Sequence, residues 1–302
     1  MRSICFFSSY YTTPAIPEYV KFYLTELGRH FSEVVFLTTE KTILAEDLEF
    51  LKGKNIAYRL YKNEGFDFGM WYKAFKEYNV IEYDRIGLVN DSCILFNKLD
   101  FYFDWLNKND IDYSGLVDCT LISYHIQSYF VVINKKAILP TLKYFEMNGI
   151  ISDFTQLIKT YEVKLCTYLM DAGIKLAAYY SFKDIPGIGN PSWQKAKSLI
   201  RDGFPLIKKK IIIRYYGPAN WISLVVNGFD PYPNHYIRLI KATNPPVSFE
   251  KLLSDLPIHK PLKDEIKFYI VAVLSQMYGL FKRAVVFIIK EPYRAIKYRS
   301  KG

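Results

Sequence analysis

The chain has 302 residues, half of them hydrophobic, with 26 tyrosines and 22 phenylalanines. This composition excludes a disordered chain and can build the core of one large domain or two smaller ones. The formal net charge of +10 favours an anionic partner: a nucleotide, a lipid headgroup or a nucleic acid. The four cysteines (Cys5, Cys93, Cys119, Cys166) are far apart, which argues against a zinc site or a disulfide framework.

The first residues do not resemble a secretory signal. Only four apolar residues follow Met1-Arg2-Ser3 before the sequence becomes polar, which is too short for a signal-peptide core. Together with the unpaired cysteines, this leads us to expect a protein that stays in the cytoplasm.

The first 60 residues predict alternating strands and helices. Strands are expected over residues 4–7, 33–37 and 56–60, and helices over residues 17–28 and 44–52. Short links between them favour a mostly parallel sheet with helices on both faces. Polar residues follow each strand, so these loops should meet at the sheet edge where nucleotides bind. Neither a G-x-G-x-x-G motif nor a Walker-type loop is present, so dinucleotide and ordinary ATP chemistries lack their signatures.

The rest of the chain is organised around residues 63–96. A polar, glycine-punctuated loop leads into a helix that carries Trp71 and Phe75 on one side. A buried strand over residues 86–89 then ends in Asn90-Asp91-Ser92. Asp91 is a candidate ligand for a metal or a phosphate, because ligands sit beyond the carboxyl ends of such strands. The alternative is that these three residues cap a following helix, and this segment alone leaves both open.

Two further polar residues stand out after residue 120. His125 precedes a β-prone run over residues 128–133. A lone histidine at such a position is more often structural. Its position at the expected cleft nevertheless makes it a candidate for contact with a phosphate or the acceptor. Glu162 is expected to open a helix that ends at Ala172-Gly173. It could complement the helix N-terminus, worth roughly 0.3–1 kcal/mol, or act as a general base.

Taken in order, these segments resemble a glycosyltransferase of the GT-A fold. The run from Glu162 to Gly173 is similar to the Glu-Asp-x-x-Leu…Gly pattern of family 2 glycosyltransferases, which implies that Glu162 is the catalytic base. Asn90-Asp91-Ser92 falls where such enzymes carry Asp-x-Asp, which implies Mg²⁺ or Mn²⁺ held by Asp91 against a sugar-nucleotide diphosphate. The sequence departs from the pattern by offering one carboxylate there and by replacing the catalytic aspartate with a glutamate.

A closer resemblance is to the rhamnan synthesis protein F family of bacterial cell-wall and capsule biosynthesis. It covers about two-thirds of the chain, as far as Ile213. The matching motifs are Asn63-x-Gly65-Phe66-Asp67-Phe68-Gly69-x-Trp71, Asn90-Asp91-Ser92, His125-Ile126-Gln127-Ser128-Tyr129-Phe130, Tyr161-Glu162, Asn190-Pro191 with Trp193, Leu199-Ile200, Gly203-Phe204-Pro205 and Ile207-Lys208.

The resemblance implies an inverting, metal-assisted transfer of a sugar from a nucleotide diphosphate sugar. Asp91 would hold the ion and Glu162 would deprotonate the acceptor, a lipid-linked glycan; the family suggests rhamnose as the sugar. The expected donor-binding residues are Ser8, Thr39, Asn63, Asp67, Asn90, Ser92, His125, Gln127 and Lys208. The basic cluster of residues 208–210 could be a solvated helix end, or it could contact a lipid phosphate or the donor diphosphate, a role that would suit Lys208 best.

The C-terminal part differs in composition. We expect a GT-A catalytic domain over residues 1–185, a family-specific extension over residues 186–259 and a basic helical tail over residues 260–302. The tail has ten basic and three acidic residues, and its uncharged run of fourteen residues is short of the roughly 20 that a spanning helix needs. This pattern favours helices lying in a membrane interface, and the family resemblance implies the inner face of the bacterial cell membrane. Packing against the catalytic domain, or against a second copy in a homodimer, is the alternative.

Two other classes of protein compete with a glycosyltransferase. A basic nucleic-acid-binding protein fits the charge, but no recognised module is present, so we expect no nucleic acid partner. A catalytically degenerate transferase could instead serve as a scaffold of a polysaccharide assembly complex. Asp91 and Glu162 argue against that role.

Overall fold

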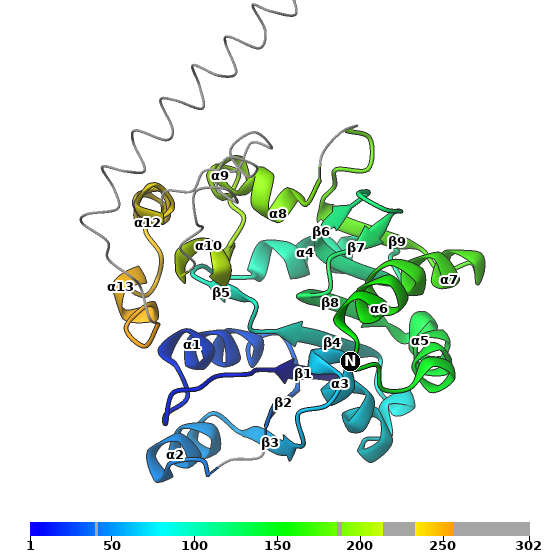
Figure 1. Cartoon of the computed structure of the whole chain (residues 1–302), viewed down its shortest axis with the longest axis horizontal. Coiled ribbons are helices and arrows are strands. Elements are labelled where there is room, and N and C mark those ends of the chain that lie inside the picture. Colours follow the sequence, from blue (N-terminus) through cyan, green and yellow to red (C-terminus); the bar gives the residue numbers. More distant parts are fainter. Residues whose placement is uncertain (40–41, 186–188, 214–232, 257–302) are drawn as a thin grey trace, which may run out of the picture. The chain divides into compact units, whose positions relative to one another are not determined.

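The computed structural model describes residues 1–39, 42–185, 189–213 and 233–256 (Figure 1). All of them belong to one compact unit, which includes Met1–Ile213 and the segment from Tyr232. The expected basic tail over residues 260–302 and part of the expected extension lie outside the described residues. The division of the chain at residues 185 and 259 therefore stays a prediction. Among the described residues, no helix is both long and apolar enough to cross a membrane.

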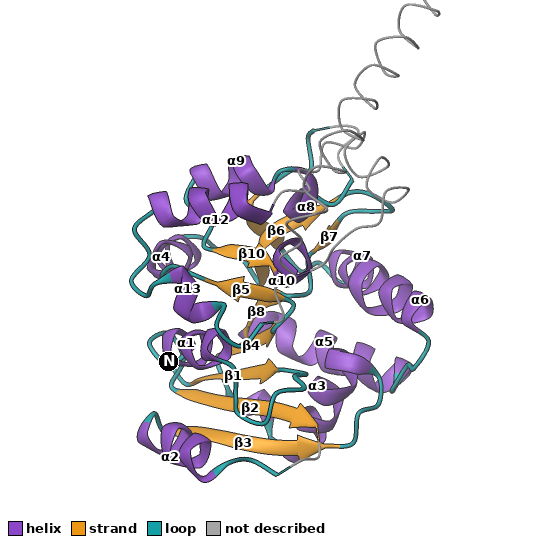
Figure 2. Ribbon diagram, turned by 60° about the vertical axis from the view of Figure 1, so that its left-hand side comes forward, coloured by secondary structure: helices purple, strands orange, loops and turns teal. Residues whose placement is uncertain are grey.

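An eight-stranded, mostly parallel sheet forms the centre of this unit, as the sequence predicted. Its order is β3-β2-β1-β4-β8-β6, and both β7 and β9 pair with β6. Strands β3, β2, β1 and β4 run parallel, and β8 is antiparallel to both of its neighbours (Figure 2). The strands are β1 (Ser3–Ser8), β2 (Glu33–Thr39), β3 (Ile56–Tyr61), β4 (Arg85–Asn90), β6 (Tyr113–Cys119), β7 (His125–Ile126), β8 (Phe130–Asn134) and β9 (Leu176–Tyr180).

Helices cover both faces of the sheet, because the central strands are apolar on both sides. On one face, Trp71 and Phe145 join the core cluster that contains Phe6. On the other face, Tyr23 contacts Phe7 with ring centroids 5.1 Å apart. The helices are α1 (Glu18–Leu27), α2 (Ala45–Gly53), α3 (Phe66–Glu77), α4 (Asp100–Lys108), α5 (Lys135–Asn148), α6 (Phe154–Leu157) and α7 (Leu165–Asp171), with a 3-10 turn η1 (Val80–Glu82).

The structure corrects two expectations about local structure. Strand β5 (Cys93–Leu95), and not a helix, follows Asn90-Asp91-Ser92, so the helix-cap interpretation is wrong. Glu162 does not open a helix either. The helical run begins at α6, where the side chain of Asp153 accepts a hydrogen bond from the Gln156 amide, and Glu162 lies in a π-helical turn, η2 (Ile158–Lys164), before α7. Glu162 therefore does not complement a helix N-terminus.

The segments after residue 189 pack beside the first part of the unit. Strand β10 (Leu206–Lys208) pairs antiparallel with β5, so that Lys208 lies opposite Cys93. Helix α12 contacts α9, and α13 contacts α1. The helices of this part are α8 (Pro191–Gln194), α9 (Ala196–Arg201), α10 (Lys209–Ile213), α12 (Pro233–Ala242) and α13 (Phe249–Leu252).

Two glycines shape the loop that leads into α3. Gly65 precedes the helix in a left-handed conformation with φ +71°. Gly69 lies one turn later, and a Cβ added there would come 1.9 Å from the carbonyl oxygen of Glu64. The loop and the helix can therefore approach each other only because residue 69 has no side chain.

Replacing Gly69 with alanine should lower the free energy of unfolding by about 2 kcal/mol, because backbone must move to relieve the contact. Gly53→Ala is the matched control, since a Cβ at Gly53, the last residue of α2, meets nothing within 4 Å. The control should change stability by less than about 1 kcal/mol, or raise it. Urea unfolding of the two variants measures the difference, and equal midpoints would contradict the close approach.

Candidate active site

The carboxyl ends of β1 and β4 carry the central residues of the candidate site. Ser8 and Asn90 end these two parallel strands side by side, and the Asp91 amide donates to the Ser8 carbonyl at 3.1 Å. The two consecutive side chains have different partners. Asn90 contacts the start of α3, whereas Asp91 contacts the segments on the side of α1 and α10. Two polar groups thus flank one strand end.

Asp67, Asn90, Ser128 and Glu162 form the first group, which we call the carboxylate cluster. The Asn90 amide donates to one oxygen of Asp67 in the first turn of α3, and its own oxygen accepts from the Ser92 amide at 3.1 Å. Ser128, between β7 and β8, donates its hydroxyl to Glu162 Oε1 at 2.7 Å. Segments nearly 100 residues apart in the chain therefore bring two carboxylates to the same sheet edge.

The surroundings of Asp67 favour its protonated form. Burial and the negative charge of Glu162 raise the pKa of Asp67 to about 6, although the hydrogen bond from Asn90 acts in the opposite direction. Asp67 therefore titrates at about pH 6. Such titration is typical of sites that move protons.

Aromatic packing holds the backbone beside Glu162 against α3. Tyr161 stacks on Phe68 with ring centroids 5.0 Å apart, and its hydroxyl donates to the carbonyl of Gly149. Phe68 follows Asp67 and Tyr161 precedes Glu162, so this stack holds the two backbone segments that carry the acids side by side. π-helical turns such as the one around Glu162 occur frequently at functional sites.

The other predicted residues near β7 are buried and make defined hydrogen bonds. His125 Nδ1 lies 2.8 Å from the Ser123 carbonyl oxygen. Burial disfavours the charged form of His125, but contacts with Cys119 and Ser123 and the charge of Glu162 raise its pKa overall. Gln127 Oε1 accepts from the Ser192 hydroxyl at 2.7 Å, so its side chain joins the interior to α8.

Asp91, Lys209, Tyr19 and Ser9 form the second group, which we call the lysine–aspartate pair with its two hydroxyls. Asp91 Oδ2 lies 2.8 Å from Lys209 Nζ and accepts from the hydroxyls of Tyr19 and Ser9, both at 3.0 Å. Burial and the nearby Asp91 charge raise the pKa of Tyr19, which therefore stays protonated and donates. Lys208, one residue earlier, lies with Nζ 4.1 Å from the centroid of the Tyr129 ring.

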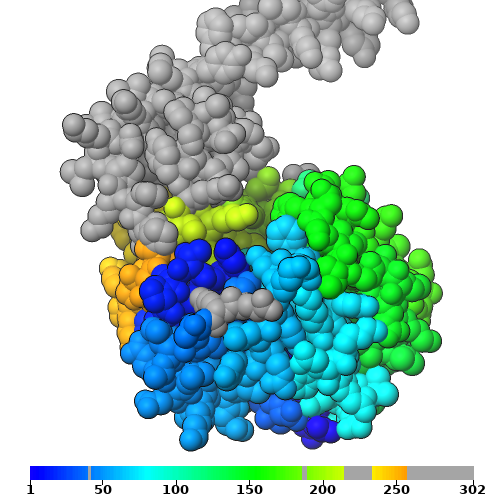
Figure 3. Space-filling view, turned by 60° about the horizontal axis from the view of Figure 1, so that its bottom comes forward, coloured from blue at the N-terminus to red at the C-terminus, as the bar shows by residue number. Residues whose placement is uncertain are grey.

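The remaining predicted residues lie at the same sheet edge with different environments. The buried Ser8 hydroxyl donates to Met70 Sδ at 3.1 Å. The Ser92 carbonyl accepts from the Lys209 amide at 2.9 Å. Thr39 is half-buried at the end of β2, and Asn63 is exposed in the loop before α3. In Figure 3 the N-terminal segment (dark blue), the segment leading into α3 (lighter blue) and residues near 210 (yellow-green) share one face. The donor-binding roles of all these residues stay predictions.

Sequence reasoning missed four side chains that complete the two groups. Ser128 stands inside a motif that we had quoted, but its hydrogen bond to Glu162 depends on the fold. Ser9 and Tyr19 follow β1, and only their burial distinguishes them from other polar residues nearby. Lys209 belongs to a basic run in which the sequence favoured its neighbour Lys208.

The surroundings of Asp91 do not fit a divalent ion. Mg²⁺ and Mn²⁺ favour several oxygen ligands, usually carboxylates with water or phosphate. Asp91 belongs to no group of three or more metal-ligating side chains among the described residues, and its Oδ2 already meets the ammonium of Lys209. The side chains around Asp91 therefore do not support the divalent ion that the sequence predicted there.

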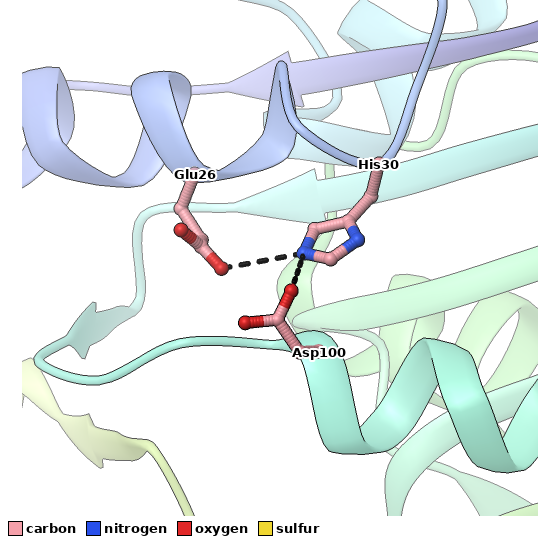
Figure 4. A group of neighbouring side chains, drawn as sticks. All are labelled: Glu26, His30 and Asp100. Carbon is pink, nitrogen blue, oxygen red and sulfur yellow. Dashed lines mark hydrogen bonds and ion pairs between the residues drawn. The ribbon is translucent and has the colours of Figure 1, made fainter.

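A different group, Glu26, His30 and Asp100, has the spacing of a metal site (Figure 4). It lies at the opposite sheet edge, because His30 stands just before β2 begins. Arg29 Nη1 is 2.9 Å from both Glu26 oxygens, and Nη2 is 2.9 Å from Asp100 Oδ1. Arg29 thus already pairs with both carboxylates, and we interpret the group as an ion-pair network.

Comparison with known proteins identifies the family. The rhamnan synthesis protein F family matches residues 38–241, and the chain belongs to this family. No curated protein matches the sequence. Family membership supports a glycosyltransferase-type role, as the sequence motifs predicted.

Solved structures with a similar arrangement are distant. A cytidylyltransferase from Leptospira borgpetersenii is 16% identical with a TM-score of 0.39, covering 86% of this chain and 100% of its own. A protein from Desulfovibrio desulfuricans described as a nucleotide-diphospho-sugar transferase is 16% identical with a TM-score of 0.37, covering 80% and 97%. The 4-diphosphocytidyl-2C-methyl-D-erythritol synthase of Anaerococcus prevotii is 9% identical with a TM-score of 0.39, covering 60% and 89%. These likenesses carry no argument about activity.

The raised pKa of Asp67 predicts a pH dependence of stability. The folded chain keeps this proton up to about pH 6, whereas an unfolded aspartate releases it near about pH 4. The folded state binds more protons between these values, so the free energy of unfolding should fall as pH rises through this window. Asp67→Asn should remove about 3 kcal/mol of this pH-dependent decrease in the free energy of unfolding, as measured by urea unfolding at several pH values. The exposed Asp184, replaced in the same way, is the control; equal slopes for both variants would contradict the assignment.

Proposed function

We propose that this protein is a glycosyltransferase that moves a sugar from a nucleotide diphosphate sugar to an acceptor hydroxyl during polysaccharide assembly. One observation carries the proposal. In a chain of the rhamnan synthesis protein F family, Asp67 accepts a hydrogen bond from Asn90 beyond the carboxyl end of β4, and the charge of Glu162 acts on Asp67. Ligands bind at this edge in open α/β sheets.

Glu162 is the general base in this proposal. Ser128 holds Oε1, and Oε2 accepts the proton of the acceptor hydroxyl as the oxygen attacks the anomeric carbon. Attack from the face opposite the leaving diphosphate inverts the configuration at that carbon. The negative charge of Asp67, once it has ionised above about pH 6, favours uptake of that proton by its neighbour.

The donor lies across the ends of β1, β2 and β4 in this proposal. Thr39 and Asn63 face the nucleoside, because both stand at the loops that follow β2 and β3. The family name supports rhamnose as the sugar, carried by a nucleoside diphosphate such as dTDP. No step of this reaction is assigned to a metal ion, because the residues around Asp91 do not fit one.

The acceptor is a lipid-linked glycan, and the protein meets it on the inner face of the bacterial cell membrane. The composition of residues 260–302 supports this part of the proposal, since the tail combines ten basic residues with apolar runs.

Glu162→Gln should lower the rate of sugar transfer by about 10²–10⁴-fold, the usual contribution of a positioned base. The amide has the same shape and can still accept the Ser128 hydrogen bond, so donor binding should persist. The control is Glu146→Gln, which changes an exposed glutamate of α5 that pairs with Lys76. Transfer of radiolabelled sugar from nucleotide sugars to a membrane extract measures the rate. Wild-type transfer by Glu162→Gln would show that another group is the base.

Deleting the tail should abolish binding to anionic membranes. A chain ending at Pro257 keeps α13, the last described helix, and should remain at the bottom of a flotation gradient with vesicles rich in anionic lipid. The full chain should float, and high salt should reduce its flotation because the attraction is electrostatic. Equal flotation of both chains would exclude the tail as the anchor.

A further inference from the structure

We propose that Lys209 supplies the positive charge for the donor diphosphate, so that donor binding needs no divalent ion. This inference rests on the proposed function and adds to it which group of this chain meets the leaving group. It departs from the sequence expectation of Mg²⁺ or Mn²⁺ at Asp91.

The first argument is the position of the ammonium. Lys209 Nζ lies 2.8 Å from Asp91 Oδ2 and 3.0 Å from the Tyr19 hydroxyl oxygen, directly beyond the end of β4. This is the place where the sequence predicted a cation. The side chain keeps 18% of its surface exposed, so a ligand can reach it.

The second argument is the number of hydrogen bonds that Lys209 can still make. An ammonium group has three N–H donors and accepts none. Its hydrogen bonds to Asp91 and Tyr19 within the described part of the chain use two of them. The third can meet a phosphate oxygen, and lysine is a common ligand of phosphates as a point charge.

The third argument is that one carboxylate oxygen of Asp91 already accepts three hydrogen bonds from the protein itself. Its Oδ2 receives Lys209, Tyr19 and Ser9 together. A divalent ion at this oxygen would have to displace the ammonium or lie in direct repulsion with it. Asp91 therefore acts as a positioning residue that orients Lys209.

The fold fixes Lys209 to the same segment as Asp91. Strand β10 pairs with β5, and the Lys209 amide donates to the Ser92 carbonyl at 2.9 Å. The Lys209 backbone is thus hydrogen-bonded to Ser92, the residue after Asp91, although 117 positions separate Lys209 from Ser92 in the sequence. The Lys208 side chain lies over the Tyr129 ring. The pairing of β10 with β5 therefore directs Lys209 to Asp91 and Lys208 to Tyr129.

Calorimetric titration with dTDP, UDP, GDP and CDP tests the proposal on the full chain. For the nucleotide that binds, affinity in excess EDTA should stay within about threefold of the affinity with Mg²⁺ or Mn²⁺. Lys209→Met should weaken binding at least about tenfold, the loss expected for a charge-assisted hydrogen bond. Lys143→Met removes the same charge from an exposed position of α5 and should bind as wild type does.

The outcomes separate the two proposals. Binding that disappears in EDTA would overturn the role of Lys209 and leave the proposed function intact. Binding of none of the four nucleotides, with or without metal, would overturn the proposed function and this inference with it. Circular dichroism shows whether Lys209→Met folds. If it does not fold, two other measurements test the proposal. Lys209→Arg keeps the charge and should bind the nucleotide in EDTA, and the wild-type chain is compared with and without EDTA.

Discussion

The candidate site depends on how the chain leaves strand β4. Successive side chains of a strand point in opposite directions, and here Asn90 and Asp91 do so at the point where the strand ends. Asn90 reaches Asp67 and the carboxylate cluster, and Asp91 reaches Lys209. One short turn therefore lies between carboxylates on one side and the Lys209 ammonium on the other. A sugar transfer needs both, a base for the acceptor and a positive charge for the leaving diphosphate.

Much of this arrangement could be predicted from the sequence. The apolar runs around β1, β2 and β4 are nearly continuous because helices bury both faces of a parallel sheet, and this pattern indicates the fold class directly. Asn63–Trp71 could be placed at the ligand edge, because Gly65 and Gly69 allow a tight approach of loop and helix. The order of the motifs led to the correct family.

The contacts that define the site could not be predicted in the same way. Lys209 reaches Asp91 only because β10 pairs with β5. No local sequence pattern predicts a short antiparallel pairing between segments so far apart in the chain. The alternation of side chains along β10 could have separated Lys208 from Lys209, had the strand been recognised. Glu162 was expected at a helix start because a π-helical turn has no sequence signature comparable to a cap. Asp153 supplies the cap nine residues before Glu162.

The most direct test of this account is a crystal structure of the protein with a bound nucleotide diphosphate sugar. We expect the diphosphate beyond the ends of β1 and β4, with a phosphate oxygen within hydrogen-bond distance of Lys209 Nζ and the sugar facing Glu162. A ligand bound at the opposite sheet edge, near Glu26 and Asp100, or a diphosphate held away from Lys209 with Glu162 out of reach of the sugar, would contradict it.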